Sequence, residues 1–176
     1  VLELVVGLFY TPILTRTLGQ SEYGLYSLVA SIISYLTVLD LGFGSAIVVY
    51  TARYRANNEK EKENRLHGMF LIIYTIIGIV AGAIGYILYL NVDKLFGNSM
   101  TLQEIEKAKM MMLILTANLV ITFPMSIFSS TITAYEKFIF AKIINIIRII
   151  INPIVMLALL YMGYKSVGIV VATTVL

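Results

Sequence analysis

Five apolar runs of helical length, and the start of a sixth, follow one another within only 176 residues. A helix needs roughly 20 mostly apolar residues to cross the ~30 Å hydrocarbon core of a bilayer, and a backbone in lipid must satisfy its own hydrogen bonds. The runs lack the alternating pattern of barrel strands, so they predict helices. We therefore expect an all-α fold, a polytopic transmembrane helical bundle, which agrees with a hydrophobic share of 59%.

The chain begins and ends inside apolar runs. Val1–Leu14 and Val167–Leu176 are each shorter than a full span, so we expect both to be truncated pieces of longer spans. The complete spans are expected at Gly24–Tyr50, Leu66–Leu90, Lys109–Ala134 and Ile143–Tyr161. The polar connections are expected at Thr15–Tyr23, Thr51–Arg65, Asn91–Ala108 and Tyr135–Lys142.

Lys and Arg are unevenly shared between these connections. Thr51–Arg65 holds five and Tyr135–Lys142 holds two, against five on the opposite side. Because Lys and Arg collect on the cytoplasmic side of membrane proteins, these two connections are predicted to face the cytoplasm. The absence of Cys and the single His67 exclude disulfides and leave no plausible metal cluster. No cofactor is expected, and no basic stripe indicates nucleic acid.

Local motifs sharpen several boundaries. Gly19 is typical of a helix C-cap, and the segment that begins at Thr101 and ends at Glu104 fits a capping box, so an outer helix is expected to lead into the fourth span. Pro124 and Pro153 should kink the fourth and fifth spans. Three glycines on one face of the third span suit close helix packing. They are Gly78, Gly82 and Gly85.

The fifth span carries a polar face. Asn145, Arg148 and Asn152 are spaced so that they lie on one side of a helix, with isoleucines around them. An intramembrane Arg is costly and usually faces a cavity or a partner. We interpret this face as lining a cavity that binds substrate, although an Arg can also extend to the membrane surface.

Two other spans carry polar stripes. The stripe of the fourth span lines a cavity or serves interhelical packing. Its members are Asn118, Thr122, Ser126, Ser129 and Thr133. In the second span, Asp40 lies far around a straight helix from a set of serines, and Gly42 and Gly44 could bend the helix. The serines are Ser27, Ser31, Ser34 and Ser45. An intramembrane carboxylate is the costlier residue, so Asp40 is the stronger functional candidate.

Three ionisable residues fall at one predicted depth. At about 1.5 Å per residue, Glu3, Asp40 and Arg148 all lie roughly 20–25 Å from the outer boundary. Opposite buried charges at one depth are expected to pair. Arg148 is therefore predicted to pair with Asp40 or Glu3 in at least one conformation, which makes these carboxylates candidates for coupling.

The first outer connection carries a recognisable sequence. It reads Arg16-Thr17-Leu18-Gly19-Gln20-Ser21-Glu22-Tyr23-Gly24-Leu25-Tyr26. It resembles the opening signature of bacterial polysaccharide-biosynthesis flippases, Arg-x-Leu-Gly-x-x-x-Tyr-Gly-x-Tyr. The matching positions are Arg16, Leu18, Gly19, Tyr23, Gly24 and Tyr26. Asp40-Leu41-Gly42 also resembles that family's Asp-x-Gly motif.

The resemblance implies a place in the multidrug, oligosaccharidyl-lipid and polysaccharide exporter superfamily. Residues 1–176 would then be an N-terminal lobe of about six helices, one half of a two-lobed transporter. The implied activity is flipping of undecaprenyl-diphosphate-linked oligosaccharide across the bacterial cytoplasmic membrane, which breaks no bond and needs no catalytic residue. The implied partners are this lipid-linked oligosaccharide and membrane lipids, with polysaccharide assembly proteins as further candidates.

Two other functions are alternatives to this flippase interpretation. A cation-coupled multidrug antiporter of the same superfamily would use Asp40 or Glu3 as its ion site, but an Arg-bearing face suits an anionic substrate better. An integral-membrane polysaccharide polymerase or transferase would need large polar loops with clusters of His, Asp or Arg, and these 176 residues do not contain such loops.

Overall fold

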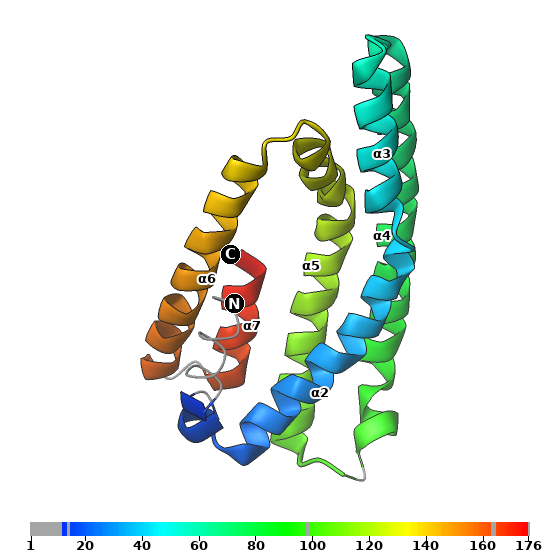
Figure 1. Ribbon diagram of the computed structural model, residues 1–176. Helices are drawn as coiled ribbons and strands as arrows, with labels where there is room; N and C mark the ends of the chain where they lie inside the picture. The colour runs from blue at the N-terminus through cyan, green and yellow to red at the C-terminus, as the bar shows by residue number, and fades with distance from the viewer. Residues whose placement is uncertain (1–11, 14, 98, 163–164, 176) are drawn as a thin grey trace.

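The computed structural model describes residues 12–13, 15–97, 99–162 and 165–175, and the described part is helical without any strand (Figure 1). The elements are α2 (Gln20–Leu36), the 3-10 turn η1 (Thr37–Asp40), α3 (Phe43–Ala56), α4 (Lys60–Phe96), α5 (Leu102–Ala134), α6 (Phe138–Tyr161) and α7 (Lys165–Val175). The predicted all-α class is confirmed.

Within the described residues, four helical stretches are long and apolar enough to cross a membrane. They are Gln20–Ala56, Lys60–Phe96, Leu102–Ala134 and Lys142–Leu159. The first of these joins α2, η1 and α3, and it matches the predicted second span. The predicted first span, Val1–Leu14, lies almost wholly outside the described residues.

The expected polar loop Thr51–Arg65 is wrong. Helix α3 continues to Ala56 and α4 begins at Lys60, so only Asn57–Glu59 connects them. Asn58 turns the chain there with a left-handed φ of 57°. Hydropathy marks where lipid ends, whereas Lys, Glu and Arg are good helix formers and let both helices continue into water.

The expected connection Asn91–Ala108 is also shorter than predicted, for the same reason. Helix α4 runs on to Phe96 and α5 begins at Leu102, within the expected segment Asn91–Ala108. The predicted capping box is confirmed, because Thr101 accepts a hydrogen bond from the Glu104 amide while the Glu104 carboxylate accepts from the Thr101 amide. The outer helix is therefore continuous with the fourth span.

Close contact between α4 and α5 forms the centre of the fold. A Cβ added at Gly78 would lie 3.0 Å from the Val120 carbonyl oxygen, and one at Gly85 would lie 2.4 Å from Thr116 Oγ1. A Cβ added at Gly82 would lie 2.7 Å from Val120 Cγ2. The prediction that this glycine face serves close packing is confirmed.

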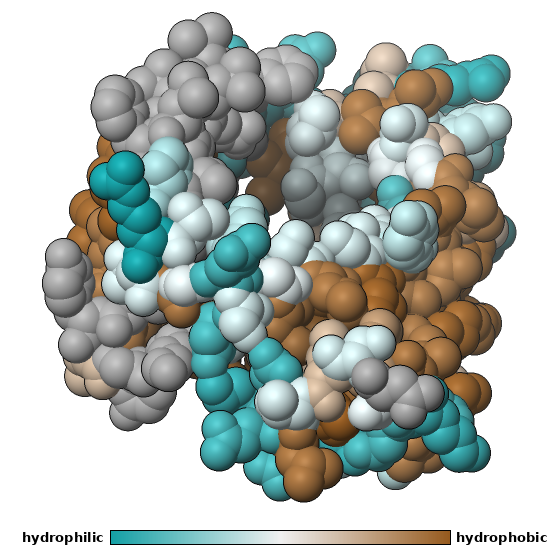
Figure 2. Space-filling view, turned by 90° about the horizontal axis from the view of Figure 1, so that it is seen from below, coloured by the Kyte–Doolittle hydropathy of each residue, from teal (hydrophilic) through white to brown (hydrophobic). Residues whose placement is uncertain are grey.

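The outward faces of α4 are apolar. Ile72, Ile76 and Ile79 are more than half exposed. Figure 2 shows hydrophobic side chains covering the right of the molecule, the side on which α4 lies in Figure 1. Such a surface on a helix of this length is what lipid contact requires.

Helices α6 and α7 form a second, smaller unit beside this centre. Helix α6 packs mainly against α7, and α7 in turn contacts α5 and α2. Figure 1 shows α6 at the opposite side of the molecule from α4. A separate apolar cluster joins Leu18 to Met156, Ile169 and Ala172.

Candidate functional site

The second span is interrupted at Asp40. Helix α2 ends at Leu36, tightens into η1, and gives way to α3 after two residues with left-handed backbone, Leu41 (φ 49°) and Gly42 (φ 74°). Gly42 tolerates this conformation because it lacks a Cβ. The bend expected from the glycines is therefore present, and it places Asp40 at the junction of two helices.

The Asp40 carboxyl is held by a buried tyrosine on α4. The Tyr74 hydroxyl donates a 2.6 Å hydrogen bond to Asp40 Oδ1. Tyr74 is fully buried, with its ring edge-on to Phe43 and stacked on Phe123. These aromatic contacts fix the hydroxyl in place, so the carboxyl is oriented by a rigid donor.

Asp40 lines a hollow of about 470 Å³ between the broken second span, α4 and α5. Seven of its ten lining residues carry a hydroxyl or carboxyl group. The lining residues are Thr37, Asp40, Gly44, Tyr74, Leu119, Thr122, Phe123, Ser126, Ser129 and Ser130. We call this hollow the Asp40 groove. It brings together Asp40 and three members of the predicted fourth-span stripe, Thr122, Ser126 and Ser129.

Two hydroxyls of the Asp40 groove donate hydrogen bonds to carbonyls of their own helix, α5. Thr122 donates to the Asn118 carbonyl and Ser126 to the Thr122 carbonyl. Their oxygen lone pairs remain available as acceptors. Together with the Asp40 carboxyl, they make a site suited to a cation, a proton or the hydroxyl donors of a sugar, and poorly suited to an anion.

Asn118 lies next to the groove and ties α5 to α7. Its amide nitrogen lies 3.3 Å from the Thr174 carbonyl oxygen, and its amide oxygen accepts from Thr122 at 3.1 Å. This predicted candidate is therefore engaged in helix packing in this conformation.

The predicted polar face of α6 is separate from the Asp40 groove. Asn145 and Arg148 are exposed, while Asn152 is half-buried with its Oδ1 lacking a hydrogen-bond partner among the described residues. Within that part of the chain Arg148 forms no ion pair. Its pairing with Asp40 stays a prediction for another conformation, and Glu3 lies outside the described residues.

Three of the six signature side chains build a structural junction, whereas Arg16 is exposed. Leu18 is buried against Met156 and Ile169, and Tyr23 and Tyr26 pack against the same cluster. Gly19 separates the preceding helical turn from α2 with φ 82°, and it forms the N-cap of α2 as well as following the turn that the sequence predicted it to end. The signature therefore ties the start of α2 to α6 and α7.

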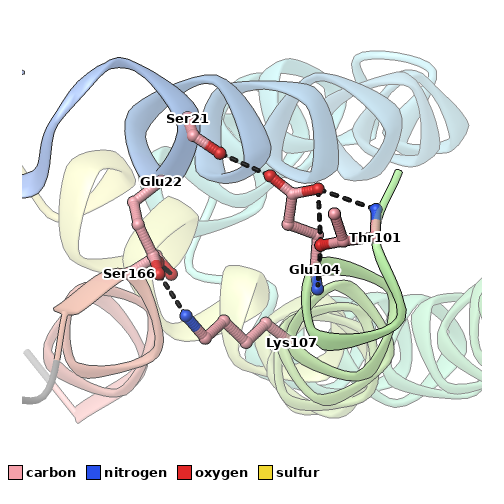
Figure 3. Close-up of polar contacts among 6 residues, drawn as sticks. All are labelled: Ser21, Glu22, Thr101, Glu104, Lys107 and Ser166. Atoms are coloured by element: carbon pink, nitrogen blue, oxygen red, sulfur yellow. Dashed lines mark hydrogen bonds and ion pairs between the residues drawn. The ribbon is translucent and has the colours of Figure 1, made fainter. Parts of the chain in front are cut away.

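Polar contacts reinforce this junction, as Figure 3 shows. Glu22 of α2 forms an ion pair with Lys107 of α5 and accepts a hydrogen bond from Ser166 of α7. Beside it, Ser21 donates to Glu104 of the capping box. Three helices that are distant in sequence are thus joined at one end of the bundle.

Sequence reasoning missed Tyr74 and this polar junction. Tyr74 lies on the glycine face of α4, so its position signalled packing and gave no hint of a carboxyl partner. Glu22, Lys107 and Ser166 are spread over 145 residues, and no local spacing could have joined them.

The comparison with family models identifies the family of this chain. The model described as polysaccharide biosynthesis protein matches residues 1–176, the whole sequence. The chain belongs to this family. Neither the comparison with curated proteins nor the comparison with solved structures found a match. Since four helices in the described part of the chain are long and apolar enough to span a bilayer, this member of the polysaccharide biosynthesis family is a multi-pass membrane protein.

Proposed function

We propose that this chain is part of a transporter that flips undecaprenyl-diphosphate-linked oligosaccharide across the bacterial cytoplasmic membrane for surface polysaccharide synthesis. The observation that carries the proposal is a polar groove with an intramembrane carboxyl, Asp40, inside the bundle of a polysaccharide biosynthesis family member. A membrane-embedded polar groove is useful for moving a hydrophilic group past lipid.

The two polar regions suit the two parts of this cargo. The hydroxyl and carboxyl groups of the Asp40 groove match the hydroxyl donors of an oligosaccharide. The cationic face of α6, with Arg148 between Asn145 and Asn152, matches the diphosphate, because a guanidinium binds phosphate oxygens in a bidentate manner. The polyprenyl chain can stay in lipid. Flipping by this scheme makes and breaks only non-covalent contacts.

Arg148 provides the test. In the full-length protein, Arg148→Ala should reduce surface polysaccharide on the order of tenfold or more, as loss of charge-assisted hydrogen bonds predicts. Arg148→Lys should rescue only partly, because Lys keeps the charge but loses the planar fork. Lys142→Ala, which removes an exposed cation from the same helix, is the control.

Surface polysaccharide and membrane protein level are measured together. Lipid-linked oligosaccharide should accumulate on the cytoplasmic side in the Arg148→Ala cells. Normal polysaccharide in these cells, at normal protein level, would remove Arg148 from the proposed phosphate site.

The geometry of Asp40 also favours a second candidate, a cation-coupled antiporter. Oxygen atoms beside a carboxyl are the ligands that a small hard cation needs, and the carboxyl itself can carry a proton. Efflux of cationic dyes by the full-length protein, lost in Asp40→Asn and unaffected by Arg148→Ala, would support this candidate over the flippase.

A further inference from the structure

The hairpin formed by α3 and α4 crosses the surface of the membrane. Helix α4 has 37 residues and is therefore about 55 Å long, well beyond a ~30 Å hydrocarbon core. Charged residues occupy its first turns up to Arg65, and exposed apolar residues begin at Met69, followed by Ile72 and Ile76. The boundary between water and hydrocarbon on this helix thus lies between Arg65 and Met69.

A hollow of about 240 Å³ lies at this boundary. Its lining changes from polar to apolar within one helical turn. The residues are Tyr54 of α3 and Lys62, Arg65, Leu66 and Met69 of α4. We call it the hairpin hollow. Two cations and a tyrosine on one side, with a leucine and a methionine on the other, form an amphipathic site at headgroup depth.

The glutamates of the hairpin cancel only part of this positive charge: Glu59 pairs with Lys62, Glu61 adds a further negative charge, and Arg65 keeps its own. Glu63 is 6% exposed and accepts a 2.7 Å hydrogen bond from Tyr135, so it faces α5. That bond raises the pKa of the Tyr135 phenol, because the hydrogen bond to Glu63 stabilises the protonated hydroxyl. Glu59 accepts from Lys62 at 2.9 Å and uses one of the three donors of that ammonium. Arg65 has no ion pair within the described residues.

We propose that the hairpin hollow binds the phosphate headgroup of an anionic phospholipid. Arg65 provides the planar fork that binds two phosphate oxygens, Lys62 adds its remaining donors, and the Tyr54 side chain completes the polar wall. The acyl chains leave past Met69 along the apolar face of α4. The site is separate from the Asp40 groove, and it does not depend on the function proposed for that groove.

Native mass spectrometry of the full-length protein tests this site. The protein is released from nanodiscs that contain equal amounts of phosphatidylglycerol and phosphatidylcholine, and retained lipid is counted. The double variant Lys62→Gln with Arg65→Gln should retain phosphatidylglycerol at least about tenfold less than the parent, on the scale of one lost charge-assisted hydrogen bond. Tyr54→Phe should cause a smaller loss.

The same hairpin offers a matched control. Arg53→Gln with Lys60→Gln removes the same charge from exposed residues that do not line the hollow. This control should retain phosphatidylglycerol as the parent does. An equal loss in both double variants would contradict the proposal, because it would show a diffuse field in place of a site.

Two further arms identify the source of the phosphate. Inorganic phosphate at millimolar concentration should not displace the bound lipid, since it lacks the apolar contacts at Leu66 and Met69. Displacement, or equal retention of phosphatidylcholine, would overturn the assignment to an anionic phospholipid. Thermal unfolding confirms that each variant is folded. If the double variant does not fold, the single variant Arg65→Gln is measured in its place, and it too should retain less phosphatidylglycerol than the parent.

Discussion

The α4–α5 interface and α6 differ in how completely their side chains are covered. In the spanning window of α5, 33% of residues are buried, against 6% in that of α6. At the interface, glycines let the backbones approach and Tyr74 satisfies Asp40. On α6, Arg148 is exposed and the Asn152 amide oxygen has no partner in the described part of the chain.

This difference separates residues that hold the bundle from residues available for binding. A polar group that already has a protein partner contributes to packing, whereas one without a partner still gains from a ligand. The glycine contacts of the α4–α5 interface therefore explain stability, and α6 is where we propose contact with the anionic part of the cargo.

The largest effect should come from filling the interface. Gly85→Leu places a Cβ 2.4 Å from Thr116 Oγ1, so the helices must separate, and overpacking of this kind costs about 1–3 kcal/mol or more. Gly68→Leu on the same helix is the control, because a Cβ there meets nothing within 4 Å.

Thermal unfolding of the detergent-solubilised full-length protein measures both variants. The Gly85 variant should unfold at a clearly lower temperature than the parent, and the Gly68 variant close to it. Equal unfolding temperatures of the two variants would mean that α4 and α5 do not approach closely at Gly85.

A smaller effect should come from removing the donor to Asp40. Tyr74→Phe keeps both ring contacts but leaves the carboxyl without its 2.6 Å hydrogen bond, at a cost of about 1–3 kcal/mol. Transport should fall as well, because the carboxyl loses its fixed orientation. The control is Tyr86→Phe, which removes an exposed hydroxyl from the same helix. A change in stability as small as that of the control would show that Tyr74 does not hold Asp40.

Much of the fold could be predicted from the sequence, since lipid imposes long apolar helices whose number and order are visible in hydropathy. The glycine face and the capping box were also predicted, because each depends on neighbours within a few turns. The ends of α3 and α4 were not, because hydropathy reports the membrane boundary and the helices continue past it. The partner of Asp40 lies 34 residues away on another helix, beyond any local pattern.

The central proposal is that the Asp40 groove and the polar face of α6, which are separate in this conformation, both contact the cargo. Labelling of single cysteines tests this proposal most directly, because these 176 residues contain no native cysteine. Thr122→Cys and Asn145→Cys are placed in the full-length protein without other cysteines, with Ile76→Cys as the lipid-facing control. Each is treated with a water-soluble thiol reagent with and without lipid-linked oligosaccharide. We predict that positions 122 and 145 react and that the oligosaccharide protects both, while position 76 stays unreactive. Position 145 remaining as unreactive as position 76 would contradict the account.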